Sequence, residues 1–333
     1  MDDAEIEWLD ASKVDSLHLC PRKFYYRYEL GLVLKGTGGL EDYANAMQYG
    51  IALHASLAVL YDGTGTDLVT CPCSTFEGCE FCRGSLIPRM AAQFLLHYPV
   101  DPGEDSKDPR TRARGIEILH AYIEKYRRES FEVIAVEVPF EVPFFEKCIS
   151  CAGSGSQQGG ASMCGPCNGT GKRLLFKYTG RIDLLVREGG AISPWDHKST
   201  SRFGEMFQAG FTLSGQVTGY ITSTHTITEE PCNEGTINAL RITTKIDPHD
   251  SFMRLTTRRT PDDIDEWKQE LLAAFGDIQR NRARKFWPKY APFACSAYNR
   301  MCEYYMLCTA GGADVKHNII TKHYEVQPWD PTK

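Results

Sequence analysis

Two short stretches joined by a turn place the strongest constraint on how this chain folds. The stretches are residues 180–185 (GRIDLL) and 195–199 (WDHKS), and a Gly-Gly turn lies between them. Because β-favouring residues flank this turn on both sides, we predict an antiparallel hairpin. Side chains alternate along a strand, so Asp196 and Lys198 are expected on one face and His197 on the other.

The predicted hairpin brings charged side chains together. Pairing of its strands can place Asp183 beside Asp196, with the Lys198 ammonium next to both. Carboxylate oxygens are the ligands that Mg²⁺ and Mn²⁺ prefer, and a nearby lysine can stabilise an attacking hydroxide or the charge on a phosphate. The pattern indicates phosphodiester cleavage. The alternative is a solvated Asp–Lys pair on an exposed strand.

Bulk composition places few limits on function. The 333 residues are 42% hydrophobic and 24% charged, as is usual for a soluble globular protein. The chain starts with an acidic segment and contains no apolar run of membrane-spanning length, so we expect a cytoplasmic protein without membrane contact. A net charge of −6 gives no global attraction to nucleic acid, so any binding surface must be local. The basic-aromatic run at 280–287 is either such a surface or a solvated helix face.

Thirteen cysteines in an intracellular chain indicate metal sites rather than disulfides. Twelve fall into three sets of four, and the remaining Cys232 is expected to be inert. The clearest set consists of two CxxC motifs, each followed by a Gly-rich turn: Cys148, Cys151, Cys164 and Cys167. This spacing is typical of structural zinc, with a redox dithiol as the alternative. The repeated CxxCxGxG unit resembles the zinc centre of DnaJ-type chaperones, which implies a zinc knuckle and no chaperone activity.

The other two sets are less specific. One lies in a polar loop with CxC…CxxC spacing and predicts a second zinc site, or else unligated surface thiols: Cys71, Cys73, Cys79 and Cys82. The other set is divided between the two ends of the chain: Cys20, Cys295, Cys302 and Cys308. A metal shared by this set would staple the chain ends together. Its wide spacing is compatible with zinc and with a [4Fe–4S] cluster.

Hydrophobic periodicity predicts a mixed α/β core with helical flanks. The expected helices cover 12–30, 45–61, 111–129 and 203–222, and a further one begins at Thr260. The expected strands cover 131–145, 174–187, 236–244 and 251–257. We predict a single domain over residues 1–310 with inserts at 71–82 and 146–172, followed by a tail at 311–333 that carries no clear motif.

Several motifs occur in a recognisable order along most of the chain. They are Gly50-x-x-x-His54, Asp183, Asp196-His197-Lys198, Gln216-x-x-x-Tyr220 and the four divided cysteines. With these motifs the chain resembles the RecB-like branch of the PD-(D/E)XK nucleases. It is similar to members with an iron–sulfur staple, such as AddB nuclease domains, CRISPR-adaptation exonucleases and above all phage-encoded relatives. Two departures are Ile182 in place of the family's proline and a wider spacing of the C-terminal cysteines.

The resemblance implies a restriction-endonuclease-like PD-(D/E)XK core, a mixed central sheet flanked by helices. It implies that Mg²⁺ or Mn²⁺ is bound by His54, Asp183, Asp196 and the carbonyl of His197. It makes Lys198, with the two aspartates, catalytic, and it assigns Gln216 and Tyr220 to DNA positioning. It assigns a [4Fe–4S] cluster to Cys20, Cys295, Cys302 and Cys308. Glu137 resembles a recurring family glutamate, and its role stays open.

The function expected from these features is metal-dependent DNA hydrolysis. We expect an exonuclease on single-stranded or end-containing DNA, acting in recombination, repair or replication. The alternatives are a structure-specific endonuclease and a non-catalytic DNA-binding scaffold. The expected partners are DNA and replication or recombination proteins, such as a helicase or a single-strand-binding protein.

Overall fold

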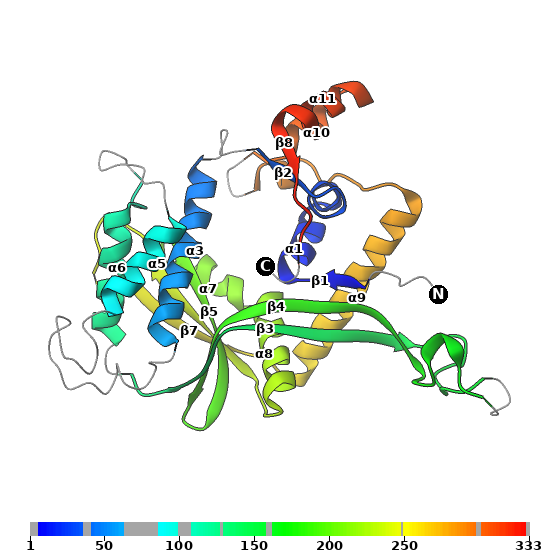
Figure 1. The fold of residues 1–333 in the computed structure, drawn as a ribbon, viewed down its shortest axis with the longest axis horizontal. Helices are drawn as coiled ribbons and strands as arrows, with labels where there is room; N and C mark the ends of the chain where they lie inside the picture. Colours follow the sequence, from blue (N-terminus) through cyan, green and yellow to red (C-terminus); the bar gives the residue numbers. More distant parts are fainter. Residues whose placement is uncertain are drawn as a thin grey trace. The chain divides into compact units, whose positions relative to one another are not determined.

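The computed structural model describes residues 6–35, 41–62, 86–98, 108–126, 129–157, 162–247, 249–297 and 301–330. Figure 1 shows these residues as a ribbon. The chain divides into two compact units, which are described separately below. Unit 1 consists of Met1–Lys35, Pro139–Gly180 and Glu266–Lys333, and unit 2 of Gly36–Val138 and Arg181–Asp265.

The described residues form both helices and strands along the whole order of the chain. The α-helices are α1 (Ala11–Leu19), α2 (Pro21–Phe24), α3 (Glu41–Tyr61), α5 (Leu86–His97), α6 (Arg112–Tyr126), α7 (Glu205–Thr212), α8 (Gly215–Thr228), α9 (Pro261–Arg284), α10 (Tyr305–Thr309) and α11 (Ala313–His323). The strands are β1 (Glu7–Leu9), β2 (Leu32–Leu34), β3 (Glu132–Lys147), β4 (Lys172–Glu188), β5 (Ala191–Thr200), β6 (Glu234–Arg241), β7 (Phe252–Arg258) and β8 (Tyr324–Val326). Among the described residues, no helix has both the length and the apolar character needed to cross a membrane.

The main sheet is mixed, with strand order β1-β4-β5-β6-β7 and β3 paired to β4. β4 and β5 form the predicted antiparallel hairpin, and β6 then pairs parallel to β5. Gly189 and Gly190 close the hairpin with φ of 57° and 87°, which a side chain would disfavour. Leu184 pairs with Trp195, so the register places Asp183 level with Asp196 one position further along.

Helices cover both faces of the unit 2 sheet. α3, α5 and α6 pack on one face, where Trp195 of β5 and Leu240 of β6 join their side chains in one core. α8 packs on the other face, against Ile237 and Ala239 of β6. Because both faces are covered, β6 is buried continuously instead of alternating between core and solvent. The predicted mixed sheet with flanking helices is therefore confirmed.

Unit 1 is built around the distal halves of β3 and β4 (Figure 1). Phe144 of β3 stacks on Phe176 of β4 with ring centroids 4.6 Å apart. Trp267 of α9 meets Tyr178 of β4 edge-on at 5.1 Å. The segment with the two CxxC motifs connects these strands, so a paired and packed hairpin carries the knuckle.

Two helices predicted as continuous are broken in the structure. The helix expected over 12–30 is interrupted at Cys20, which is extended and precedes Pro21 at the first position of α2. The helix expected over 203–222 is interrupted at Ser214, whose hydroxyl accepts a hydrogen bond from the Val217 amide at 3.4 Å and caps α8. α5, which the pattern analysis did not predict, buries Met90 and Phe94 in the unit 2 core.

The last described strand, β8, lies against the N-terminal segment of unit 1. β8 pairs antiparallel with β2, so that Tyr324 lies opposite Leu34. Tyr324 is 2% exposed, stacks on Tyr304 at 5.8 Å and donates a hydrogen bond to the carbonyl of Glu303 at 2.5 Å. Residues that carried no sequence motif thus contribute to a small core.

This packing makes the effect of a tail substitution predictable. We expect Tyr324→Ala to lower the free energy of unfolding by about 3 kcal/mol, because it removes a buried ring and leaves a cavity. Val326→Ala is the matched control, since Val326 lies on the same strand and is 65% exposed. Thermal unfolding of the metal-loaded proteins measures the difference, and equal midpoints for the two variants would contradict the packing described.

Candidate active site and metal centres

Asp183 links the two strands of the β4–β5 hairpin to helix α3. Its Oδ2 accepts a hydrogen bond from the backbone N–H of His197 at 2.6 Å and lies 3.5 Å from Nδ1 of His54. Asp183 is only 8% exposed. Residues that are 129 positions apart in sequence, His54 and Asp183, therefore meet at one point.

Asp196 and Lys198 occupy the same face of β5, as the alternation of a strand predicts. The Lys198 ammonium donates a hydrogen bond to Oδ1 of Asp196 at 2.8 Å. It also lies 2.7 Å from Oδ2, as an ion-pair contact without hydrogen-bond geometry. Asp196 is 2% exposed, whereas Lys198 is half-buried. The pair thus joins a buried carboxylate to an accessible cation.

The electrostatics of this cluster fit a bound divalent cation. Burial raises the pKa of Asp196, and the nearby charge of Asp183 raises it further against the opposing effect of Lys198. Burial also acts to raise the pKa of Asp183, but the charge and hydrogen bond of His54 outweigh it and the pKa is lowered. The two buried carboxylates thus share one point with the Lys198 ammonium and the His54 ring, and hard cations bind oxygen donors of this kind.

A buried polar network lies behind β5. Nδ2 of Asn238, on β6, donates to Nδ1 of His197 at 3.0 Å and contacts the Tyr122 hydroxyl at 2.8 Å. The Tyr122 and Tyr61 hydroxyls are 2.7 Å apart. Burial lowers the pKa of His197 to about 3, so its ring is neutral and accepts the hydrogen bond. The sequence motifs did not predict this network, although an asparagine within the apolar β6 was a signal for it.

Glu137 adds a third carboxylate near the cluster. Its φ is 51°, in the left-handed region that a non-glycine residue rarely adopts within a strand. Its carboxylate lies 3.6 Å from the Arg181 guanidinium. Burial raises the pKa of Glu137, and the charge of Asp183 raises it further. The unusual backbone at Glu137 thus occurs where β3 passes close to the hairpin carboxylates.

Gln216 and Tyr220 lie one turn apart on α8, as predicted. Nε2 of Gln216 donates to the Tyr220 hydroxyl at 2.9 Å. Their neighbours Val217 and Ile221 pack against β6. The two polar side chains are therefore held by a helix whose apolar face is buried on the sheet.

The two CxxC motifs bring four buried sulfurs together in unit 1. The sulfurs of Cys148, Cys151, Cys164 and Cys167 all lie within 4.8 Å of one another. The Cys148–Cys164 and Cys151–Cys167 distances are 3.9 and 3.7 Å. Four thiolates around one zinc at about 2.3 Å would be about 3.8 Å apart. The donor set and its geometry fit tetrahedral zinc.

Glycines allow this knuckle to close. Gly155 has φ of 77°, and a Cβ there would lie 2.3 Å from the carbonyl oxygen of Gly169. Gly171 has φ of 69° and makes an equally close approach to Gly153. The Gly155 amide donates to the sulfur of Cys151 at 3.4 Å. The CxxCxGxG repeat is thus required sterically, because each motif approaches the other backbone to backbone.

The cysteines from the two chain ends also lie in one region of unit 1. The Cys302 amide donates to the carbonyl of Cys295 at 2.8 Å, and Nε of Arg22 donates to the carbonyl of Trp287 at 2.8 Å. Burial raises the pKa of the Cys308 thiol, and the neighbouring Cys20 and Cys295 raise it further. Of the described cysteines, only the knuckle set brings its four sulfurs within 4.8 Å. The remaining set, Cys71, Cys73, Cys79 and Cys82, lies outside the described residues.

Comparison with known proteins identifies the family. The family model described as the PD-(D/E)XK nuclease superfamily matches residues 9–309. The chain belongs to this superfamily. No curated protein matches the chain. Nineteen chains of solved structures match; one of them, titled "Crystal structure of SSO0001", has 11% sequence identity and a TM-score of 0.29. That match covers 72% of this chain and 87% of the other.

The knuckle geometry predicts the metal content of cysteine variants. We expect Cys164→Ser to lower the zinc content by about one ion per chain, because a structural site needs all four thiolates. Cys232→Ser is the matched control, since Cys232 lies in unit 2 and outside the knuckle. Metal analysis of the purified proteins measures the difference. An unchanged zinc content in Cys164→Ser would show that the knuckle does not bind zinc.

Proposed function

We propose that this superfamily member is a Mg²⁺- or Mn²⁺-dependent deoxyribonuclease that works as an exonuclease on single-stranded or end-containing DNA. The observation that carries the proposal is the convergence of His54, Asp183, Asp196 and Lys198 on one hairpin and one helix. A PD-(D/E)XK superfamily match over residues 9–309 supports the same chemistry.

In this proposal each residue of the cluster has one task. His54, Asp183, Asp196 and the carbonyl of His197 hold the metal ion. When bound, the ion supplies a water of lowered pKa and compensates the charge of the phosphate. The half-buried Lys198 orients the attacking water and stabilises the charge that develops on the phosphate. The Asn238–His197 hydrogen bond positions the β5 backbone from behind.

Residues outside the cluster position the strand and stabilise the fold. Gln216 and Tyr220 hold the DNA strand, and Glu137 contributes a further carboxylate to the metal site. We propose that Cys20, Cys295, Cys302 and Cys308 bind a structural [4Fe–4S] cluster. A cluster of four irons takes its thiolates at separate corners, which suits the wider spacing of these sulfurs better than a single zinc does.

The proposed cellular setting follows from the sequence. We propose one nuclease domain over residues 1–310 with its two inserts, acting in the cytoplasm on recombination, repair or replication intermediates. A helicase or a single-strand-binding protein is the expected protein partner, and a phage-encoded origin is consistent with the cysteine spacing.

The activity test compares Lys198→Ala with the unchanged protein on DNA labelled at either end, in Mg²⁺ or Mn²⁺. We expect the variant to cut at least about 100-fold more slowly, because it lacks the cation that stabilises the developing charge. Lys245→Ala, an exposed lysine of unit 2, is the control and should cut normally. If the unchanged protein cuts neither single- nor double-stranded DNA, the nuclease proposal fails and a DNA-binding scaffold replaces it.

Circular DNA separates the two kinds of nuclease. An exonuclease needs a strand end, so we expect single-stranded linear DNA to be degraded while the same sequence, closed into a circle, persists. The products are resolved on denaturing gels after equal incubation. Cleavage of the circle at a comparable rate would identify a structure-specific endonuclease instead.

The iron–sulfur proposal predicts a coloured protein. After anaerobic purification we expect a brown protein with broad visible absorption, lost in Cys20→Ser and retained in Cys232→Ser. Iron and sulfide analysis of the same samples checks the assignment. A colourless protein that contains only zinc would contradict it.

A further inference from the structure

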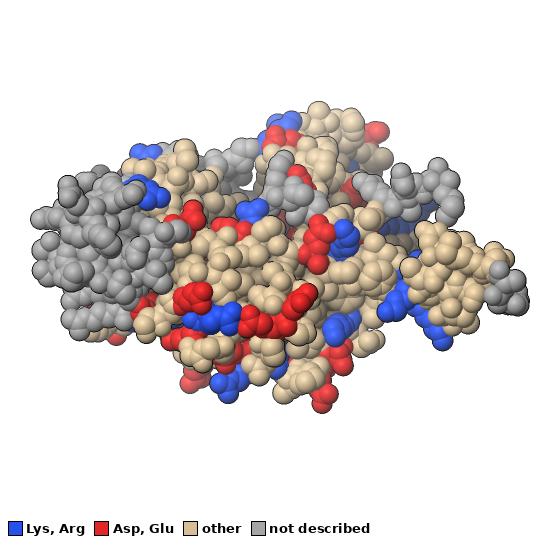
Figure 2. Space-filling view, turned by 60° about the horizontal axis from the view of Figure 1, so that its bottom comes forward, with Lys and Arg blue, Asp and Glu red and all other residues tan. Residues whose placement is uncertain are grey.

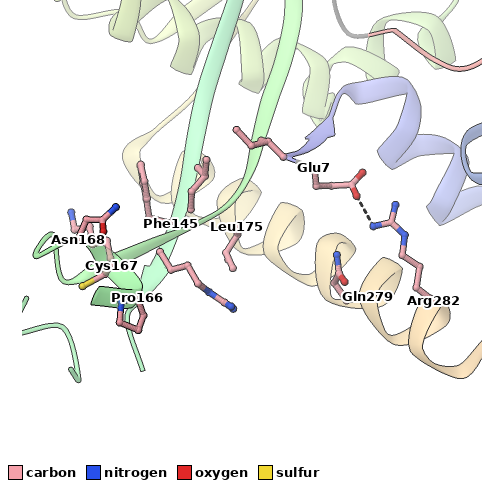
Figure 3. Close-up of a pocket in the computed structure, with 12 residues that line it drawn as sticks. Glu7, Phe145, Pro166, Cys167, Asn168, Leu175, Gln279 and Arg282 are labelled. Carbon is pink, nitrogen blue, oxygen red and sulfur yellow. Dashed lines mark hydrogen bonds and ion pairs between the residues drawn. The ribbon is translucent and has the colours of Figure 1, made fainter. Parts of the chain in front are cut away.

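An open hollow of about 650 Å³ lies beside the zinc knuckle within unit 1. Figure 3 shows its walls: Phe145 and Leu175 come from the two strands, Pro166 to Asn168 from the knuckle, and Gln279 and Arg282 from α9. Its volume lies in the range of sites for small organic ligands. None of these residues belongs to the proposed active site.

Phe145 gives this hollow an exposed aromatic face. Along β3 the side chains alternate, so Phe144 points into the core while Phe145 is 51% exposed and lines the hollow. Burial of an exposed ring of this size is favourable when a flat partner covers it. The position of Phe145 therefore indicates a ligand with a planar face.

The hollow is also bordered by cations. No Asp or Glu occurs between Lys147 and Arg173, although the whole chain has a net charge of −6. Figure 2 shows acidic and basic side chains interspersed over one face of the molecule, so an acid-free segment of this length is a local feature. The exposed Lys172 ammonium makes no ion pair with any described residue, whereas Nε of Arg173 donates to Glu146 at 2.7 Å. Lys172 is thus the cation most available to an anion.

Two features could reduce the attraction of the hollow for an anion. Zinc with four thiolates would carry a formal charge of −2, but the knuckle sulfurs are buried while Lys172 and Arg173 are exposed. Arg282 on the opposite wall is already neutralised, because it hydrogen-bonds to Glu7 (Figure 3) and also to Glu29. The net attraction for an anion therefore lies on the strand and knuckle side.

Amide side chains complete the lining. Asn168, at the turn after the second CxxC motif, and Gln279 of α9 are both exposed and border the hollow. Amides donate and accept hydrogen bonds and so match the edges of nucleobases. An acidic peptide would use the cations but would leave the aromatic face and the amides without a matching partner.

We propose that this hollow is a second, non-catalytic contact for single-stranded nucleic acid. One base stacks on Phe145, the adjoining phosphate lies against Lys172, and the amides of Asn168 and Gln279 meet the base edge. Stacking with backbone neutralisation is the usual mode of single-strand binding, and a paired duplex would not offer an unstacked base. The site needs neither the hairpin carboxylates nor their metal, so it stands apart from the proposed nuclease activity.

The test measures binding without cleavage. Zinc-loaded Lys198→Ala protein is titrated into fluorescein-labelled oligo(dT) without added Mg²⁺, Mn²⁺ or chelator, and anisotropy is recorded. We expect Phe145→Ala and Phe145→Leu in this background to weaken binding about 10-fold, because stacking on the ring is lost. Phe145→Trp should bind at least as well as the parent. Leucine keeps the apolar contact but not the aromatic face. Comparing Phe145→Leu with Phe145→Trp therefore measures the contribution of stacking to the affinity.

The charge contribution has its own control. Lys172→Glu should weaken binding and reduce the slope of log affinity against log salt by about one. Lys322→Glu, an exposed lysine of α11 in unit 1, makes the same charge change away from the hollow and should have little effect. Zinc content equal to the parent verifies that each variant is folded at the knuckle.

The outcomes separate this proposal from the proposed function. Binding that depends on Phe145 and Lys172 in a protein that never cuts DNA would support the hollow and defeat the nuclease. If the protein cuts DNA but every hollow variant binds oligo(dT) as tightly as the parent, the nuclease proposal stands and the proposed nucleic-acid contact is overturned. The hollow would then be a peptide-binding surface. Absence of any binding to oligo(dT) also overturns the proposal.

Discussion

The hydrogen bond from the His197 amide to Asp183 is the interaction on which the candidate site depends. At 2.6 Å it ties a buried carboxylate of β4 to the backbone of β5. It holds Asp183 level with Asp196, and it leaves Asp183 facing His54 of α3. A slip of one residue between these strands would turn Asp196 and Lys198 to the opposite face of the sheet. The register of β4 and β5 thus determines the geometry of the candidate site.

The polar residues behind β5 preserve that register within an apolar core. A buried amide or imidazole is costly unless it is hydrogen-bonded, and Asn238, His197 and Tyr122 largely satisfy one another. Arg254 packs beside this network. Its guanidinium lies 4.2 Å from the Trp195 ring centroid and donates a hydrogen bond to Glu129. Since each group would be poorly placed in another register, the network favours a single pairing of β5 with β6.

The parts of the structure that could be predicted from the sequence are those fixed by interactions between neighbouring residues. The hairpin and the knuckle depend on short spacings and on glycines, so their geometry could be read directly from the residues. The break at Ser214 rests on a local N-cap, which the continuous helical periodicity of residues 203–222 concealed. The burial of α5 depends on distant partners, and the hydrophobic pattern did not predict it. For the same reason the segment after residue 310 carried no motif, although Tyr324 packs on Tyr304 and β8 pairs with β2.

The sequence by itself determined the candidate chemistry: two aspartates and a lysine on a hairpin, and four cysteines spaced for one zinc. These follow from the two-residue repeat of a strand and the tight turns of CxxC motifs, which involve only neighbouring residues. Only the tertiary structure decided which further residues complete them, including Asn238 and Tyr122 behind β5 and the walls of the hollow that Phe145 faces. Packing brings these residues together, and sequence spacing does not encode their distances.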